Sequence, residues 1–163
     1  MGDCATWWFD HVGHTYMYVI ATKGGDERMQ AQAVEKLIAG TEEWGKLLGN
    51  VDSGKLMAEH VVGVKNLADA AFAKDQNGID ISVESLLVNA KQQADHYVQT
   101  MRDFPVDEFD KLFTTHLTAT GGYILALASG DIGDFHKNYN TVIQNRNNLA
   151  RFWGLLCLRL KTR

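Results

Sequence analysis

The feature of this chain that most constrains its fold is a set of spacings that recurs three times. In each copy, an aspartate follows a histidine after fifteen residues, and a glycine or asparagine follows the aspartate after fourteen. The three sets are His11–Asp26–Gly40, His60–Asp75–Asn89 and His116–Asp131–Asn145. Recurring internal spacing is typical of one supersecondary unit repeated in tandem, and it places one histidine at the same point of each unit.

The residues around these positions also align without gaps. Matching columns hold large side chains seven residues after the histidines, apolar side chains in the second half of each copy, and small residues further on. They are Tyr18/Leu67/Tyr123, Leu37/Leu86/Val142 and Gly45/Ala94/Ala150. The alternative is that any two amphipathic helices align to this extent. We predict three repeats, over about 4–48, 53–102 and 106–160, within a single domain that spans residues 1–163.

The hydrophobic pattern predicts helices throughout the chain. Apolar residues recur at spacings of three and four, and the only proline is Pro105, which suits the first turn of a helix. Asp26 and Asp131 are expected N-caps, Asp52 or Ser53 is expected to start the third helix, and 77–82 is expected to form a loop. Short linkers make neighbouring helices antiparallel. We therefore predict an all-α, six-helix antiparallel bundle of three hairpins, with helices over 4–22, 27–48, 53–73, 82–102, 106–128 and 132–160.

Composition narrows the class of protein. Hydrophobic residues make up 45% and charged residues 22% of the chain, as in ordinary globular domains. A net charge of −4 argues against a nucleic-acid surface. No segment reaches the roughly 18 apolar residues of a membrane span, and the acidic N-terminus is unlike a secretory signal. We predict a cytoplasmic protein in which Cys4 and Cys157 are two buried free thiols, with a redox pair between them as the alternative.

The first six residues fit the short template for N-myristoylation at Gly2. Asp3 and the bulky Trp7 suit that template poorly. Acylation of Gly2 is therefore left open.

The three repeated histidines are the main candidates for a site. Their neighbours three, four and seven residues away are mostly apolar or aromatic, so His11, His60 and His116 are expected to face the core from the first helix of each hairpin. Buried imidazoles lose their charge, and three neutral rings that converge suit zinc or a similar divalent metal, with a position left for water or substrate. The alternative is that each histidine forms structural hydrogen bonds with polar residues of the second helices, such as Glu42, Asn89, Gln93 and Asn145.

Arg146 is the second unusual residue, because it lies at the centre of an apolar helix face. A buried arginine needs a carboxylate or an anionic ligand, whereas a snorkelling arginine needs neither. Arg146, Asn89, Asn145 and Glu42 are therefore the candidate ligand-binding residues.

Two functions from different classes follow. The first is a small helical protein with a buried histidine-centred site for a divalent metal or a small anion; if it is an enzyme, a metal-activated water is the simplest mechanism. The second is a structural or protein-interaction module. Exposure of Trp7, Trp8 and Phe9 together favours a partner surface, and their packing around His11 favours the closed site. A small-molecule or protein partner and a homo-oligomer all fit the sequence.

Several motifs together resemble those of a known family. They are Asp10-His11, 40–45, the stretch from Leu56 through His60 to Asp75, Asn89-Ala90, and the stretch from His116-Leu117-Thr118 to Gly130-Asp131. The chain resembles a family of small, mostly uncharacterised all-helical bacterial proteins, and it is more loosely similar to DinB-like bundles, which implies a helical-bundle fold. The chain departs from the family at two places. The family has asparagine at the position of Gly40, and it has His-Asp-His where this chain has Arg146-Asn147-Asn148. DinB-like bundles have a late His-x-x-x-His that is absent here.

Overall fold

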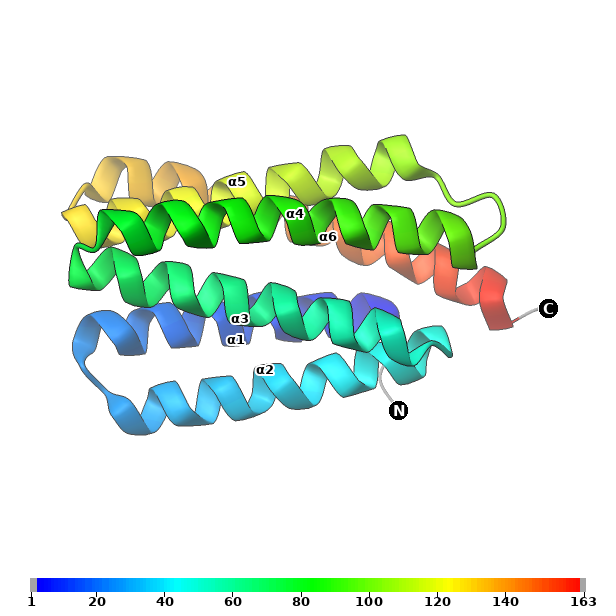
Figure 1. Cartoon of the computed structure of the whole chain (residues 1–163), viewed down its shortest axis with the longest axis horizontal. Coiled ribbons are helices and arrows are strands. Elements are labelled where there is room, and N and C mark those ends of the chain that lie inside the picture. The colour runs from blue at the N-terminus through cyan, green and yellow to red at the C-terminus, as the bar shows by residue number, and fades with distance from the viewer. Residues whose placement is uncertain (1–2, 162–163) are drawn as a thin grey trace.

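The computed structural model describes residues 3–161, and every regular element in that range is an α-helix (Figure 1). This confirms the predicted all-α bundle of six helices. The helices are α1 (Cys4–Gly24), α2 (Glu27–Leu48), α3 (Val51–Ala73), α4 (Gln76–Thr100), α5 (Val106–Ser129) and α6 (Ile132–Lys161).

The helices form a closed ring, because each packs on its two neighbours in sequence and α6 returns to pack on α1 (Figure 1). The odd-numbered helices α1, α3 and α5 also contact one another inside this ring. Ring contacts of Trp8 with Phe113 and of Tyr16 with Tyr123 show that α1 and α5 run in the same direction. The arrangement is compatible with three consecutive antiparallel hairpins, each with its first helix inside the ring.

The connections within the three hairpins share one geometry. A residue with left-handed backbone comes first, at Gly25, Lys74 and Gly130. The aspartate of the repeated spacing comes next and caps the following helix. Asp26 accepts from the amide of Met29 at 2.9 Å, Asp75 from that of Gly78 at 3.0 Å, and Asp131 from that of Asp134 at 2.9 Å. An aspartate at this position satisfies amides that the first helical turn leaves without partners.

This capping corrects the predicted start of the fourth helix. The loop expected over 77–82 does not form, and α4 begins at Gln76 instead of residue 82. Asn77 and Gly78 have turn propensity, but the Asp75 cap places them inside the first helical turn. The bond from Ser82 Oγ to the Gly78 carbonyl lies within the helix, at 2.7 Å.

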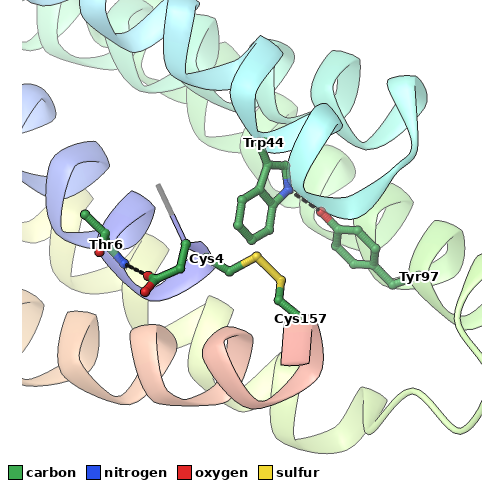
Figure 2. Close-up of a disulfide and its surroundings, with 6 residues drawn as sticks. Cys4, Thr6, Trp44, Tyr97 and Cys157 are labelled. Carbon is green, nitrogen blue, oxygen red and sulfur yellow. Dashed lines mark hydrogen bonds between the residues drawn. A yellow bond between two sulfur atoms is a disulfide. The ribbon is translucent and has the colours of Figure 1, made fainter. Parts of the chain in front are cut away.

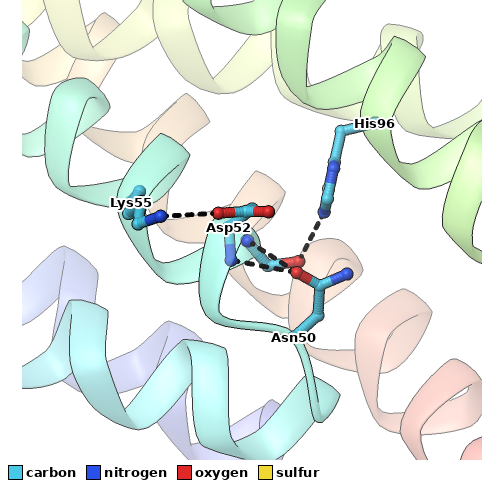
Figure 3. A network of polar contacts seen from close by, with 5 residues as sticks. Asn50, Asp52, Lys55 and His96 are labelled. Carbon is cyan, nitrogen blue, oxygen red and sulfur yellow. Dashed lines mark hydrogen bonds and ion pairs between the residues drawn. The ribbon is translucent and has the colours of Figure 1, made fainter.

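The start of α3 is also earlier than predicted. Asn50, rather than Asp52 or Ser53, is the N-cap, and its side chain accepts from the amides of both residues (Figure 3). Lys55 pairs with Asp52 at 2.8 Å, and Ser53 Oγ lies 3.0 Å from Nε2 of His96 on α4. The contact of Ser53 with His96 connects the beginning of the second hairpin to its own second helix.

The core divides into two clusters along the bundle. One cluster is rich in aromatic rings and includes Trp8, Trp44, Phe113 and Trp153. The other is mainly aliphatic and includes Val64, Leu67 and Ile124. Trp44 donates from Nε1 to the Tyr97 hydroxyl at 3.1 Å inside the aromatic cluster (Figure 2). The histidines of the repeat lie where these two clusters meet.

A disulfide joins Cys4 at the start of α1 to Cys157 near the end of α6, across a Cα–Cα distance of 6.4 Å (Figure 2). The prediction of two free thiols is therefore wrong, because the packing of α6 on α1 brings the two sulfurs together. Disulfides persist mainly in oxidising compartments. The cytoplasmic location stays a prediction.

None of the described helices is long and apolar enough to cross a membrane, as the sequence predicts. Gly2, the candidate acylation site, lies outside the described residues.

Candidate metal centre

Three inner helices each bring one histidine to a common point. His11 comes from α1, His60 from α3 and His116 from α5. Their ring centroids form a nearly equilateral triangle, with sides of 5.5 Å for His11–His60, 5.8 Å for His60–His116 and 5.9 Å for His11–His116. One nitrogen from each ring lies within 4.8 Å of the other two. The equivalent positions of the repeat thus converge, as the sequence predicts.

The three histidines are almost entirely buried, and several of their ring nitrogens have no hydrogen-bond partner in the described chain. The exposed fractions of His11, His60 and His116 are 5%, 0% and 2%. Within residues 3–161, both ring nitrogens of His60 and Nδ1 of His116 are buried without a hydrogen-bond partner. Leaving a buried polar atom without a partner costs about 1–3 kcal/mol. The triad therefore contains several donor or acceptor atoms whose burial nothing in the described chain offsets.

Burial also sets the charge of these rings. It lowers the pKa of His60 to about 3, with the nearby His116 adding to the effect, and it lowers the pKa of His116 to about 4. The pKa of His11 lies well below its ordinary value, chiefly through burial and further through the charges of His60, His116 and His14. All three rings are neutral at pH 7, which is the form that binds metals.

Aromatic side chains enclose the triad. The Trp7 ring stacks on His11, with 4.9 Å between centroids and 8° between planes. Trp8 meets both His11 and His116 edge to face, each at 5.5 Å. Trp7 and Trp8 are buried, and only Phe9 of the three N-terminal rings is exposed, at 42%. This packing around His11 favours the closed site over a continuous aromatic partner surface.

The polar residues expected to hydrogen-bond the histidines bind elsewhere. Asn89 donates to the carbonyl of Leu56 at 2.9 Å, and Gln93 donates to Asn89 Oδ1 at 2.8 Å. Asn145 donates to the carbonyl of Leu112 at 3.0 Å. Both asparagines thus connect the second helix of a hairpin to the first, one turn before the histidine. Their role as ligand-binding residues stays a prediction.

The first hairpin makes the equivalent connection in the opposite direction. Gly40, which occupies the asparagine position, accepts at its carbonyl from Trp7 Nε1 at 2.7 Å. The donor and acceptor residues are separated by 33 positions in all three hairpins. This shared register is compatible with the repeat that the spacing predicts.

Arg146 and Glu42 lie apart from the triad contacts. The Arg146 guanidinium lies over the Phe9 ring, 4.5 Å from Cζ to the ring centroid, and it donates weakly to Asn147 at 3.5 Å. Its Nε is buried and has no hydrogen-bond partner in the described chain. Glu42 is exposed on α2. Binding of a small anion by Arg146, and a ligand-binding role for Glu42, stay predictions.

A cavity of about 410 Å³ lies beside His11, between α1 and α2, and its lining includes Asp10, His14 and Glu43. Sequence reasoning did not select these residues as a site. Gly40 is the one indication of this cavity in the sequence. It stands where the other two hairpins have asparagine, and it lines the cavity.

Comparison with family models, with curated proteins and with solved structures finds no match. The resemblance to helical bacterial proteins therefore stays a prediction.

Proposed function

We propose that this protein binds one divalent metal ion of the zinc class through His11, His60 and His116. The observation that carries the proposal is the convergence of three buried neutral imidazoles, with one nitrogen of each within 4.8 Å of the others. Imidazole suits zinc, copper, iron and nickel, whereas magnesium and calcium prefer oxygen ligands.

The orphaned ring nitrogens support this proposal over the structural alternative. Histidines that serve only as core hydrogen-bonders have partners for their ring nitrogens. Neither nitrogen of His60 has one among residues 3–161. A metal ion would bind one nitrogen of each ring and offset part of the cost of burying them.

The arrangement also bears on affinity and chemistry. Metal-binding histidines usually donate their second nitrogen to a carbonyl or carboxylate, and removing such a partner typically weakens binding 10–100-fold. Since the part of the chain that the structure describes provides no such partner for His60, we expect weaker binding than in zinc sites with a complete outer shell. Zinc held by three protein ligands keeps a fourth position for water or substrate, and this is the chemistry it would supply.

Elemental mass spectrometry after equilibration with zinc tests the proposal. We expect about one ion per chain in the unmodified protein and in His136→Leu, which changes an exposed histidine of α6. His60→Leu should lose the ion and stay folded, because leucine replaces an uncharged ring in a fully buried position. Absence of zinc, cobalt and nickel from the unmodified protein, or retention of the ion by folded His60→Leu, would overturn the proposal.

A further inference from the structure

The cavity between α1 and α2 lies directly against the histidine triad. It has a volume of about 410 Å³, within the range of small-molecule sites, and its wall includes His11 and the Trp7 ring stacked on it. His60 and His116 are not among its lining residues. The cavity therefore reaches the triad at one histidine and from one side.

The cavity occurs where the repeat is broken. In the second and third hairpins an asparagine side chain crosses from the outer helix to the inner one, through the bonds from Asn89 to Leu56 and from Asn145 to Leu112. Gly40 has no side chain at this position and lines the cavity instead. A Cβ atom placed on Gly40 would meet only Trp7 Nε1, at 3.6 Å. The position can thus carry a side chain, and its absence leaves the space open.

The charges around the cavity select the class of ligand. Two carboxylates, those of Asp10 and Glu43, lie in its lining with one ammonium group, that of Lys36. The lining is therefore net negative, and the whole chain carries a net charge of −4. Negative walls around a small cavity raise the local concentration of cations. Trp7, Leu37 and Ala39 give the lining apolar surface that suits a short hydrocarbon chain, and His11 and His14 add two imidazoles.

We propose that this cavity binds a small organic ammonium compound, with its ammonium group held by Asp10 and Glu43 and its carbon chain against Trp7. Gly40 is the residue that keeps the cavity open. The further role of the cavity as the entrance to a metal centre rests on the proposed function, whereas binding of the ammonium compound does not require the metal.

Four probes of equal chain length test the ligand class on chelator-treated protein. They are putrescine, 4-aminobutyrate, 1,4-butanediol and succinate. Binding is followed by NMR through the Trp7 indole N–H, which bonds the Gly40 carbonyl at the cavity wall, with the Trp153 indole as reference. We expect saturable shifts of the Trp7 signal with the two amines, and at least tenfold weaker binding of the diol and of succinate. Equal or tighter binding of succinate, or no shift with any probe, would overturn the proposal.

Two sets of variants test the location, with saturation-transfer signals on putrescine as the measurement. Gly40→Asn, which restores the asparagine of the other hairpins, should abolish putrescine binding. The double variant Asp10→Asn/Glu43→Gln should weaken putrescine binding at least tenfold. It tests the same cavity even if Gly40→Asn fails to fold. Glu27→Gln/Glu84→Gln, which removes two exposed carboxylates elsewhere, should leave it unchanged.

Unchanged putrescine binding in folded Gly40→Asn, or in the Asp10/Glu43 variant, would overturn the proposal. Zinc content is measured on the same samples after reloading. Loss of putrescine binding with zinc retained in Gly40→Asn is the expected result. Absence of zinc from the unmodified protein, with putrescine still bound, would overturn the proposed function and leave the ligand assignment intact.

Discussion

The first hairpin and the other two use the same position of the second helix in opposite ways. Asn89 and Asn145 reach across to the first helix of their hairpins, and the bundle is closed beside His60 and His116. Gly40 accepts a bond from Trp7 instead, and a cavity lies beside His11. The first hairpin thus differs from the other two at one position, and the cavity lies at that position.

The largest expected effect is a loss of stability on acidification, and it comes from the buried histidines rather than from the rest of the molecule. His60 and His116 have folded-state pKa values of about 3 and about 4, both below the ordinary 6.5. Between pH 6.5 and pH 4 the unfolded chain binds protons that the folded chain refuses, so stability falls as pH falls. At pH 4.5 the two rings together should remove about 5 kcal/mol from the free energy of unfolding, at about 1.4 kcal/mol per pH unit for each.

Urea unfolding of chelator-treated protein from pH 7 to pH 4.5 measures this loss. His60→Leu should reduce the pH slope by roughly a third, since it removes one of the three rings whose pKa burial lowers. An unfolding free energy that is flat over this range would show that the rings are protonated in the folded state.

The disulfide connects the first hairpin to the third, and the chain between the two cysteines includes the whole second hairpin. Reduction should lower the free energy of unfolding by about 2–5 kcal/mol, because it releases a constraint over nearly the whole chain. Thermal unfolding with and without reductant measures the effect, and Cys4→Ser/Cys157→Ser should match the reduced protein. Identical melting of the oxidised and reduced forms would contradict the link.

Matched alanine substitutions compare the three hairpins directly. Asn89→Ala and Asn145→Ala should each destabilise the protein by about 1 kcal/mol through the loss of a buried cross-helix hydrogen bond. Gly40→Ala should stabilise it by about 0.5–1 kcal/mol, because alanine is the better helix former and its Cβ makes only an ordinary contact. Destabilisation of the same size at all three positions would remove the distinction between the hairpins.

The smallest expected effect concerns the loop of the second hairpin. Lys74 has a left-handed backbone with φ of 57°, where the other two hairpins have Gly25 and Gly130. Lys74→Gly should stabilise the protein by a few tenths of a kcal/mol, since relief of strain exceeds the added freedom of the unfolded chain. Gly130→Ala is the reverse change and should destabilise it. A clear loss of stability in Lys74→Gly would contradict the equivalence of the three loops.

Much of the fold and the core of the site could be predicted from the sequence, because both depend on local periodicity. The spacing of His11, His60 and His116 predicted three equivalent inward positions, and packing brings them together. The fourth helix begins earlier than the sequence predicts because the Asp75 cap prevails over the turn propensity of Asn77-Gly78, and Asp75 shares its column with two other capping aspartates.

The remaining features depend on contacts between distant segments. Whether Cys4 meets Cys157 is decided by the packing of α1 against α6, and spacing in the sequence carries no information on that distance. The cavity likewise depends on α1 and α2 bringing Asp10 and Glu43 into one lining. In the sequence, Gly40 shows that the first hairpin differs from the other two, but it does not indicate that a cavity lies there or which residues line it.

The most direct test of the metal centre is a crystal structure of the zinc-loaded protein with anomalous data collected at the zinc edge. The account predicts one anomalous peak at the centre of the triad, about 2.0–2.1 Å from one nitrogen each of His11, His60 and His116. A peak bound elsewhere, such as at His14 and Asp10, with the triad free of metal would contradict it.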